Sequence, residues 1–404
     1  MSADAEGRMH EFFDKRIGKH LRRPEARASF AAYAFGILAD GERKSVEPIA
    51  ARLTADPEEC QRMHDRLLYF LGHGVWSDQL VRREAALYAI EALQERDAVM
   101  PWIIDDTGFL KQGGHSVGVQ RQYTGSAGKI ANCQVAVSLS VATRTDHVPI
   151  DFALYLPESW TADSVRRKEA RIPDDVVFKT KLELAMDLIA RAVDDGVPGE
   201  VVLADSAYGD SSDFRNVVRM HGLDIAVAVK AQTKVWVLDT LGRRRGDPVG
   251  VQELGVQLGT TAFRRLTWRE GTRTKMHARF CFRRVKPSHD DGSEAKDREP
   301  LWLIMEWPEG EAKPTKFVLT SLPRRMAKKL IVRLVKERWR TERAYEDLKG
   351  ELGLDHFEGR SFPGWNHHIS VVLSCYAFVL AERLRHSPPS AKRKREAGAL
   401  RFAA

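Results

Sequence analysis

Two aspartates in this sequence directly follow short apolar runs. Asp105 follows PWII, and Asp205 follows VVLA. A carboxylate just past the C-terminal end of a strand lies at the lip of the sheet, where α/β folds place their sites. For either aspartate, the alternative is a helix cap or the start of a turn. Asp106 competes for the first position, and we prefer Asp105 because it directly follows the apolar run and Thr107 lies two residues on.

A third set of residues lies further along the chain, in the segment KERWRTERAYEDLKGE. Arg338, Glu342, Tyr345 and Lys349 stand there at offsets of 0, 4, 7 and 11 residues. At about 100° per residue, these positions share one face of a helix. The alternative is a solvated surface helix in which Arg338 and Glu342 form an i,i+4 ion pair.

Asp105, Asp205 and Glu342 together suit hard divalent cations. Mg²⁺ or Mn²⁺ prefers a few carboxylates, with water and phosphate oxygens completing its shell. Two such ions a few ångströms apart can activate an attacking oxygen and stabilise a leaving one. The three acids therefore indicate phosphodiester chemistry with two Mg²⁺ or Mn²⁺ ions, and no histidine is needed as a ligand.

The order of the surrounding elements predicts the fold that must position these acids. Residues 98–230 contain three strands, then a helix, a strand, a helix and a strand. This order favours an α/β fold with a mixed sheet and helices on its faces. Residues 231–325 have short strands separated by charged turns, which predicts a β-rich insertion. Residues 326–386 return to a helical pattern and complete the catalytic domain.

The two ends of the chain differ from this middle part. Residues 1–97 have helical periodicity and no strand pattern, which predicts a separate all-helical domain. Residues 387–404 are broken by proline and basic, and we expect a disordered tail. The charged loop 286–300 is expected to be mobile for the same compositional reason.

Composition limits the classes of function. The chain has 404 residues, of which 43% are hydrophobic and 30% charged, as expected of a soluble globular protein. The net charge of +8 favours a polyanion such as nucleic acid as partner. No apolar run is long enough to span a bilayer, so we expect no membrane and a cytoplasmic protein that associates with the nucleoid when it is bound to DNA. The four cysteines are far apart, which indicates free thiols rather than a zinc site.

The motifs resemble the DDE transposases of bacterial insertion sequences. One branch of that family is marked by Tyr, two residues, Arg, three residues, Glu, six residues and Lys, and Arg338, Glu342 and Lys349 match this spacing. The Tyr position falls on Val335, which departs from the pattern. The Asp-x-Thr context of the first acid and the Asp-small-Tyr-Gly context of the second are matched by IDDTG and ADSAYGD. The resemblance covers roughly residues 30 to 385.

The resemblance implies a ribonuclease H-like catalytic domain with a β-rich insertion between the second and third acids. It implies metal-dependent endonuclease cleavage at the ends of an insertion sequence, followed by attack of the 3′-OH on target DNA, as in cut-and-paste transposition. Asp105, Asp205 and Glu342 would hold the two ions, and Arg338 and Lys349 would contact DNA phosphates. The partners would be double-stranded DNA, as terminal inverted repeats and target, and a second copy of the chain in a dimer when two ends are synapsed.

Further DNA contacts are expected outside the acids. The N-terminal helices are candidate readers of the terminal repeats. The insertion carries arginines interleaved with tryptophans, a combination that suits distorted or unpaired DNA. The candidate residues of the insertion are Arg264, Arg283, Trp302 and Trp307. The alternative for each of them is a place in the core of a small sheet.

Two other functions remain open at this point. A ribonuclease H-like DNA nuclease would share the acids and the metals but would not join 3′-OH ends to a target. A domesticated transposase would act only as a DNA-binding protein, and the intact acids argue against it.

Overall fold

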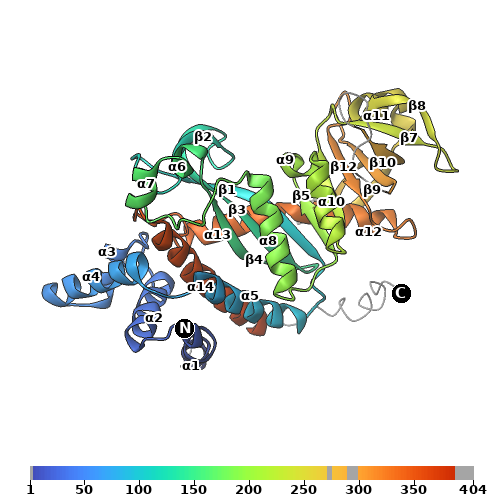
Figure 1. Ribbon diagram of the computed structural model, residues 1–404. Coiled ribbons are helices and arrows are strands. Elements are labelled where there is room, and N and C mark those ends of the chain that lie inside the picture. Colours follow the sequence, from blue (N-terminus) through green and yellow to red (C-terminus); the bar gives the residue numbers. More distant parts are fainter. Residues whose placement is uncertain (1–2, 271–274, 289–298, 387–404) are drawn as a thin grey trace.

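The computed structural model of the chain describes residues 3–270, 275–288 and 299–386. The expected tail, 387–404, and most of the expected mobile loop, 286–300, lie outside the described residues. All the described strands belong to one large mixed sheet, which is flanked by helices. The N-terminal helices lie at one end of the molecule and the insertion lies at the other (Figure 1).

Five strands form the centre of the sheet, in the order β4-β3-β1-β5-β6. They are β1 (Pro101–Leu110), β3 (Lys129–Ala142), β4 (His147–Tyr155), β5 (Val201–Ala204) and β6 (Asp224–Val229). β1, β3 and β4 pair antiparallel, whereas β5 is parallel to both β1 and β6. This is the ribonuclease H-like arrangement, and it confirms the predicted fold class. A short strand, β2 (Gln120–Thr124), forms a hairpin with β3.

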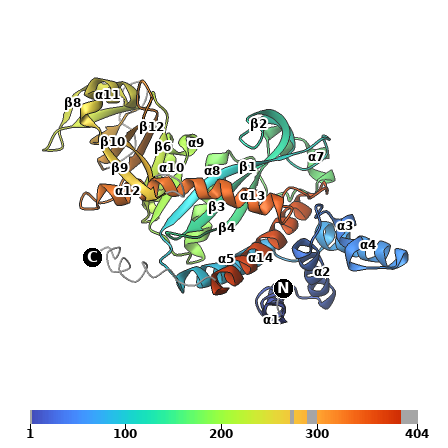
Figure 2. The same ribbon diagram turned by 180° about the vertical axis from the view of Figure 1, so that it is seen from behind.

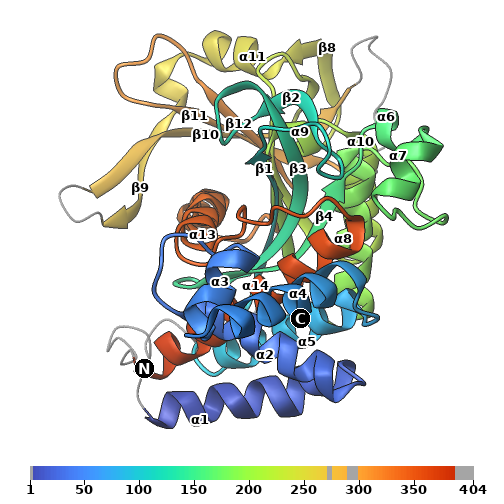
Figure 3. The same cartoon turned by 90° about the vertical axis from the view of Figure 1, so that its left-hand side faces the viewer.

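The two faces of the sheet are covered by different helices. Figure 3 shows α8 (Lys181–Asp194) on one side of β1 and β3, and α13 (Trp339–Gly350) on the other. α8 begins at a capping box, in which Thr180 Oγ1 accepts from the Glu183 N–H at 3.2 Å and the Glu183 carboxylate accepts from the Thr180 N–H at 2.7 Å. α10 (Ser212–Met220) packs beside α8.

The segment before α13 is not one continuous helix as its periodicity predicts. α12 (Lys328–Val335) is separated from α13 by one turn of 3-10 helix, Lys336–Arg338. Ile331 and Val332 of α12 are buried against the face of the sheet that carries Ile103 and Leu203. The shorter helices are α6 (Glu158–Thr161), α7 (Ser164–Glu169) and α9 (Ser206–Gly209).

The β-rich insertion extends the central sheet instead of forming a sheet of its own. β12 (Lys316–Thr320) pairs antiparallel with β6, and the sheet continues through β11 (Leu301–Trp307) and β10 (Lys275–Pro287). The remaining elements are β7 (Lys234–Leu238), β8 (Arg244–Gly250), α11 (Val251–Leu258) and β9 (Arg264–Glu270). β8 and α11 were not predicted. The β8 sequence RRGDPVG contains two glycines, a proline and three charges, all typical of a loop.

The N-terminal helices pack on the last helix of the chain, as Figure 2 shows from behind. They are α1 (Ala3–Glu11), α2 (Pro24–Leu38), α3 (Val46–Leu53), α4 (Pro57–His73) and α5 (Asp78–Gln94). A π-helical turn, Phe12–Ile17, and a 3-10 turn, Gly18–His20, connect α1 to α2. α14 (Phe362–His386) is apolar around most of its circumference, which suits a helix buried between two layers.

Two adjacent histidines of α14 hold the N-terminal helices in place. His367 Nδ1 lies 2.7 Å from the Leu71 carbonyl, and its ring stacks on Trp76 at 3.8 Å. His368 Nδ1 lies 2.9 Å from the Tyr33 hydroxyl. Burial lowers the pKa of His368 to about 3, so its imidazole is neutral at ordinary pH. None of the described helices is both long enough and apolar enough to cross a membrane.

Arg82 of α5 joins these helices to the catalytic sheet. Its guanidinium is 2.7 Å from Asp151 of β4 and 2.8 Å from Asp78, and it donates to Ser370 Oγ of α14 at 3.1 Å. The side chain is only 4% exposed. Removing one partner of a buried ion pair leaves the other charge without compensation.

We predict that Arg82→Ala lowers the free energy of unfolding by about 3 kcal/mol, because Asp151 then stays largely buried with fewer partners. Chemical denaturation measures the change. Arg83→Ala is the matched control, because Arg83 is 43% exposed and its ion pair with Asp195 contributes less than about 1 kcal/mol. Equal losses in both variants would contradict the prediction.

Candidate active site

The pairing of β1 with β5 brings Asp105 and Asp205 to neighbouring positions. Ile103 and Leu203 are partners in the parallel register, and the two aspartates follow each of them by two residues. Adjacent strands lie about 4.8 Å apart, and residues two apart point to the same face. Asp205 directly follows β5, as predicted, but Asp105 does not follow its strand, because β1 continues to Leu110 through its pairing with β3. The register places Asp105 and Asp205 at neighbouring positions on the face covered by α12 and α13.

Asp105 is a buried carboxyl group in contact with the guanidinium of Arg338. Its side chain is 13% exposed, and Oδ2 accepts from Arg338 Nη1 at 3.0 Å. Oδ1 accepts from the Asp106 N–H at 2.9 Å. Burial raises the pKa of Asp105 to about 7, with Asp205 and Asp106 adding to the rise and Arg338 opposing it. The negative charge of Asp205 thus makes it harder to ionise Asp105.

Asp106 points to the opposite face of the sheet. Its Oδ2 lies 2.9 Å from Lys181 Nζ, at the start of α8. Only Asp105 of the two therefore shares a face with Asp205, so the geometry favours Asp105 at the position for which Asp106 competes.

Asp205 also caps the short helix α9. Its Oδ1 accepts from the Ala207 N–H at 2.9 Å, so the capping alternative describes a real contact. The cap occupies one oxygen, and a carboxylate has a second that can bind elsewhere. α9 lies tightly on β6, because a Cβ added to Gly209 would stand 2.0 Å from the Ala228 carbonyl oxygen.

Three of the four predicted side chains of α13 and the turn before it contact β1 or its neighbour. Arg338 binds Asp105, as described above. The Tyr345 hydroxyl lies 2.5 Å from that of Ser138, which is the cross-strand partner of Asp105. Lys349 Nζ donates to the Gly108 carbonyl at 2.7 Å and to Ser126 Oγ at 3.2 Å.

Glu342 belongs to the same helix but is exposed to solvent. It lies one turn after Arg338 and about one turn before Tyr345, so its Cα faces the same side of the helix. In the described ranges, no group of three His, Cys, Asp or Glu side chains is close enough together to hold a metal ion. The structure thus brings together Asp105 and Asp205, with Glu342 on the neighbouring helix.

The residues present fit a hard divalent cation. Carboxylate oxygens are the donors that Mg²⁺ prefers, and this ion is commonly bound through one or two carboxylates with water around it. Arg338 already places a cation on Asp105, which shows that the position attracts positive charge. The Tyr208 hydroxyl is buried without a hydrogen-bond partner among the described residues. Burial raises its pKa, and the charges of Asp106, Asp205 and Asp105 raise it further.

The expected DNA-contacting residues of the insertion divide into two kinds. Trp302 packs edge-on against Phe282 at 6.2 Å, and Trp307 packs edge-on against Phe263 at 5.2 Å. Arg264 on β9 is exposed, whereas the half-buried Arg283 donates to the Phe282 carbonyl. Of the four, Arg264 is the most accessible to a partner.

A basic groove lies between the insertion and the helices α12 and α13, and we refer to it as the basic groove below. Its volume is about 690 Å³. The lining cations are Arg144, Arg269, Lys316, Arg333, Lys336 and Arg340, with Glu306 and Glu337 as the lining acids. Trp268 and Trp339 add aromatic surface, and the Arg269 guanidinium lies 4.9 Å from the Trp339 ring centroid. Our sequence reasoning missed this groove; alternating cations and tryptophans in RRLTWRE and KERWRTER were its signal.

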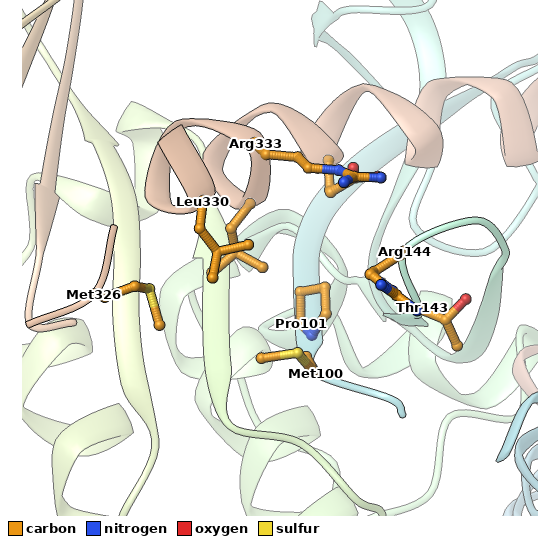
Figure 4. Close-up of a pocket in the computed structure, with 9 residues that line it drawn as sticks. Met100, Pro101, Thr143, Arg144, Met326, Leu330 and Arg333 are labelled. Atoms are coloured by element: carbon orange, nitrogen blue, oxygen red, sulfur yellow. The ribbon is translucent and has the colours of Figure 1, made fainter. Parts of the chain in front are cut away.

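A smaller cavity of about 30 Å³ lies where α12 meets the start of β1. Figure 4 shows Met326 and Leu330 facing Met100 and Pro101 across it. It is too small for a nucleotide, and its apolar lining identifies it as an imperfection in the packing of α12 on the sheet.

Comparison with known proteins identifies the family of the chain. A family model described as DDE superfamily endonuclease matches residues 16–275, and a model described as transposase DDE domain matches residues 174–378. The chain belongs to the DDE superfamily of endonucleases, as the resemblance predicted.

The individual relatives share 30% identity or less with this chain. A probable transposase for insertion sequence element IS701 from Microchaete diplosiphon is 30% identical over 219 residues, which cover 53% of this chain and 52% of the relative. The chain thus matches about half the length of that curated relative. A cryo-EM structure of the piggyBac transposase synaptic complex with hairpin DNA aligns with a TM-score of 0.46 and 10% identity, over 93% of this chain and 70% of that one. The fold assignment rests on strand order and direction.

The raised pKa of Asp105 has a consequence for stability. Between the unfolded pKa near 3.8 and the folded pKa of about 7, the folded state holds a proton that the unfolded state has lost. Stability therefore falls as pH rises through this window, by about 1.4 kcal/mol at most for every pH unit. Asp105→Asn removes this dependence.

We predict that Asp105→Asn raises the melting temperature relative to wild type more at pH 8 than at pH 5. Thermal unfolding without divalent metal, at both pH values, measures the difference. A difference that is the same at both pH values would show that Asp105 titrates normally.

Proposed function

We propose that the protein is a transposase that cuts the ends of an insertion sequence and joins the freed 3′-OH ends to target DNA. One observation carries this proposal: the pairing of β1 with β5 brings Asp105, within β1, beside Asp205, directly after β5, on the sheet face covered by the helix that bears Glu342. Membership of the DDE superfamily and the similarity to a probable insertion-sequence transposase support the same activity.

Asp105 and Asp205 are the proposed ligands for Mg²⁺ or Mn²⁺. Two such ions, when bound, supply an activated attacking oxygen and stabilise the leaving oxygen. The raised pKa of Asp105 means that its proton competes with a cation near pH 7. Deprotonated Asp105 beside Asp205 concentrates negative charge, which a divalent cation neutralises.

Arg338 has two possible anions in this proposal. It binds Asp105 directly, and a metal ion on Asp105 competes with the guanidinium for the same oxygen. The released side chain is a long cation beside the site, and a guanidinium binds phosphate well through paired N–H donors. We propose that Arg338 then contacts a DNA phosphate and that Lys349, held at the end of β1, contacts a second one.

Glu342 completes the proposed ligand set. The 3-10 turn at Lys336–Arg338 interrupts the helical segment directly before α13, and such turns often mark hinges. A small rotation of α13 about this turn brings the Glu342 carboxylate toward Asp105 and Asp205. Arg338 moves with the same turn, so its transfer to phosphate and the approach of Glu342 are coupled.

The remaining parts are assigned to DNA binding and assembly. We propose that the helical domain, 1–97, reads the terminal repeats and that two chains form a dimer when the ends are synapsed. We propose the basic groove and Arg264 as contacts for the DNA backbone, since cations lined along one surface neutralise phosphates. A protein of this kind acts in the cytoplasm, at the nucleoid.

The first test is cleavage of a labelled duplex that carries the element's end, with Mg²⁺ or Mn²⁺. We predict that wild type releases a 3′-OH end and joins it to target, whereas Asp105→Asn, Asp205→Asn and Glu342→Gln still bind DNA and lose at least about 10³-fold of the cutting rate. Gel analysis measures both steps and the binding separately.

The outcomes of this experiment separate the competing functions. Cleavage without joining would favour a ribonuclease H-like nuclease. Binding without cleavage in either metal would favour a DNA-binding protein. Asp106→Asn is the matched control. Loss of cutting in that variant, with full activity in Asp105→Asn, would show that the first ligand is Asp106 and not Asp105.

A second test concerns the basic groove. Arg269→Glu places a negative charge beside Trp339, and we predict about a tenfold loss of DNA affinity at low salt with a smaller dependence of affinity on salt concentration. Titration of labelled duplex at several salt concentrations measures both quantities.

Lys313→Glu makes the same charge change on an exposed residue of the insertion that does not line the groove. This control should bind DNA nearly as wild type does. An equal loss in both variants would show that only net charge matters and that the groove is not a contact surface.

A further inference from the structure

The turn of the β2–β3 hairpin is bound to β1 beside the candidate site. Thr124, at the end of β2, is buried against Gly108, where an added Cβ would stand 1.9 Å from the threonine hydroxyl. Ser126 Oγ accepts from the Gly108 N–H and donates to the Gly108 carbonyl, both at 3.2 Å. Lys349 Nζ donates to the same hydroxyl at 3.2 Å. Gly108 follows Asp105 by three residues, or about 10 Å along a strand, so the turn is held close to the site.

The strand register decides which side chains of the hairpin lie on the same face as the site. Asp105 is the cross-strand partner of Ser138, and Ile130 precedes Ser138 by eight residues on β3, so all three share one face. Tyr123 is the cross-strand partner of Ile130, and Arg121 lies two residues before Tyr123. We refer to Arg121, Tyr123 and Ile130 as the hairpin surface. Figure 2 shows the hairpin beyond α13, on the side away from α14.

The hairpin surface consists of large side chains that are open to solvent. Tyr123 is 64% exposed and Ile130 is 61% exposed, although the two are cross-strand neighbours. Arg121 is exposed as well, and its guanidinium has no ion-pair partner among the residues that the structure describes. Large apolar side chains that lie exposed next to each other mark an interaction site more often than single ones do. The hairpin surface therefore has the properties of a contact surface.

The charge of this region indicates the kind of partner. No aspartate or glutamate occurs from Lys111 to Thr145, although the chain has 56 of these acids among its 404 residues. The charged side chains of the hairpin are the exposed Arg121 and Lys129, and Lys349 lies beside its turn. Such a surface attracts phosphates. It is less suited to a second copy of the chain, whose net charge is +8, because like charges repel.

We propose that the hairpin surface binds the duplex DNA that leads to the cleaved bond. The inference rests on the proposed function, because it takes Asp105 as part of the site at which DNA is cut. Arg121 neutralises a phosphate, and Tyr123 and Ile130 cover the sugars beside it. The turn is held about 10 Å along β1 from Asp105, and each strand of B-DNA has one phosphate per about 3.4 Å. The contact therefore lies within about five base pairs of the cleaved bond.

The test is photo-crosslinking of the full chain to a labelled duplex that carries the element's end. p-Benzoylphenylalanine in place of Tyr123 keeps an aromatic ring at this exposed position and forms a covalent bond under light with the molecule that touches it. We expect a crosslink to DNA within about five nucleotides of the cleaved bond. A crosslink to a second copy of the chain instead of DNA, or to DNA further from that bond, overturns the proposal.

The same probe in place of Met220 is the matched control. Met220 is 74% exposed on α10, which packs beside α8 on the other face of the sheet. No crosslink to DNA is expected from this position. Equal crosslinking from both positions would show that the contact is not specific to the hairpin surface, and the proposal would fall.

DNA affinity gives an independent measurement. We expect Arg121→Ala to bind the duplex about three- to tenfold more weakly at low salt and to lower the salt slope by about one, because one phosphate contact is lost. Tyr123→Ala should also bind more weakly, but with an unchanged salt slope, because no charge is removed. Lys313→Ala, which removes one exposed charge elsewhere, should bind as wild type does. Equal losses in Arg121→Ala and Lys313→Ala contradict the proposal.

Asp105→Asn separates failure of this inference from failure of the proposed function. If wild type cuts the duplex, Asp105→Asn does not, and the hairpin variants bind and crosslink as their controls do, the inference alone is wrong. If wild type neither binds nor cuts the element's end, the proposed function is wrong and the inference falls with it.

Discussion

The parallel pairing of β1 with β5 is the constraint on which the candidate site depends. Asp105 lies within β1 and Asp205 directly follows β5, and the in-register pairing of Ile103 with Leu203 brings the two residues to neighbouring positions on the same face. Strand alternation then sends Asp106 to the other face, where it meets Lys181. A shift of one residue in this register would exchange the roles of Asp105 and Asp106. The chemistry thus depends on a backbone pairing buried in the core.

The helices on the two faces have different functions around this edge. α8 on one face neutralises Asp106 and stabilises the sheet, whereas α12 and α13 on the other face bring Arg338, Tyr345 and Lys349 to β1 and β3. α14 lies between the sheet and the N-terminal helices, and its histidines bond to both α2 and α4. The N-terminal helices therefore pack on the same helix that packs against the sheet carrying the acids.

Local patterns predicted the strands that carry the two aspartates and failed where the outcome depends on tertiary contacts. VVLA is a strand that ends before Asp205, whereas the strand that contains PWII continues past Asp105 to Leu110. Arg338, Tyr345 and Lys349 contact β1 or β3, and Glu342 is exposed. β8 was missed because its charged sequence has no apolar alternation, and it is a strand only through its pairing with β7. The basic groove needed Trp268 of β9 beside Trp339 of α13, which no local pattern can show. The approach of Glu342 to the aspartates stays a prediction.

The central claim is that Asp105 and Asp205 share a divalent metal ion. The most direct measurement is anomalous X-ray scattering from Mn²⁺ in crystals of the protein bound to its element's end. Our account predicts a manganese peak between the carboxylates of Asp105 and Asp205, on the face covered by α13. A peak at Asp106 and Lys181 on the α8 face, or no peak near either aspartate at saturating Mn²⁺, would contradict it.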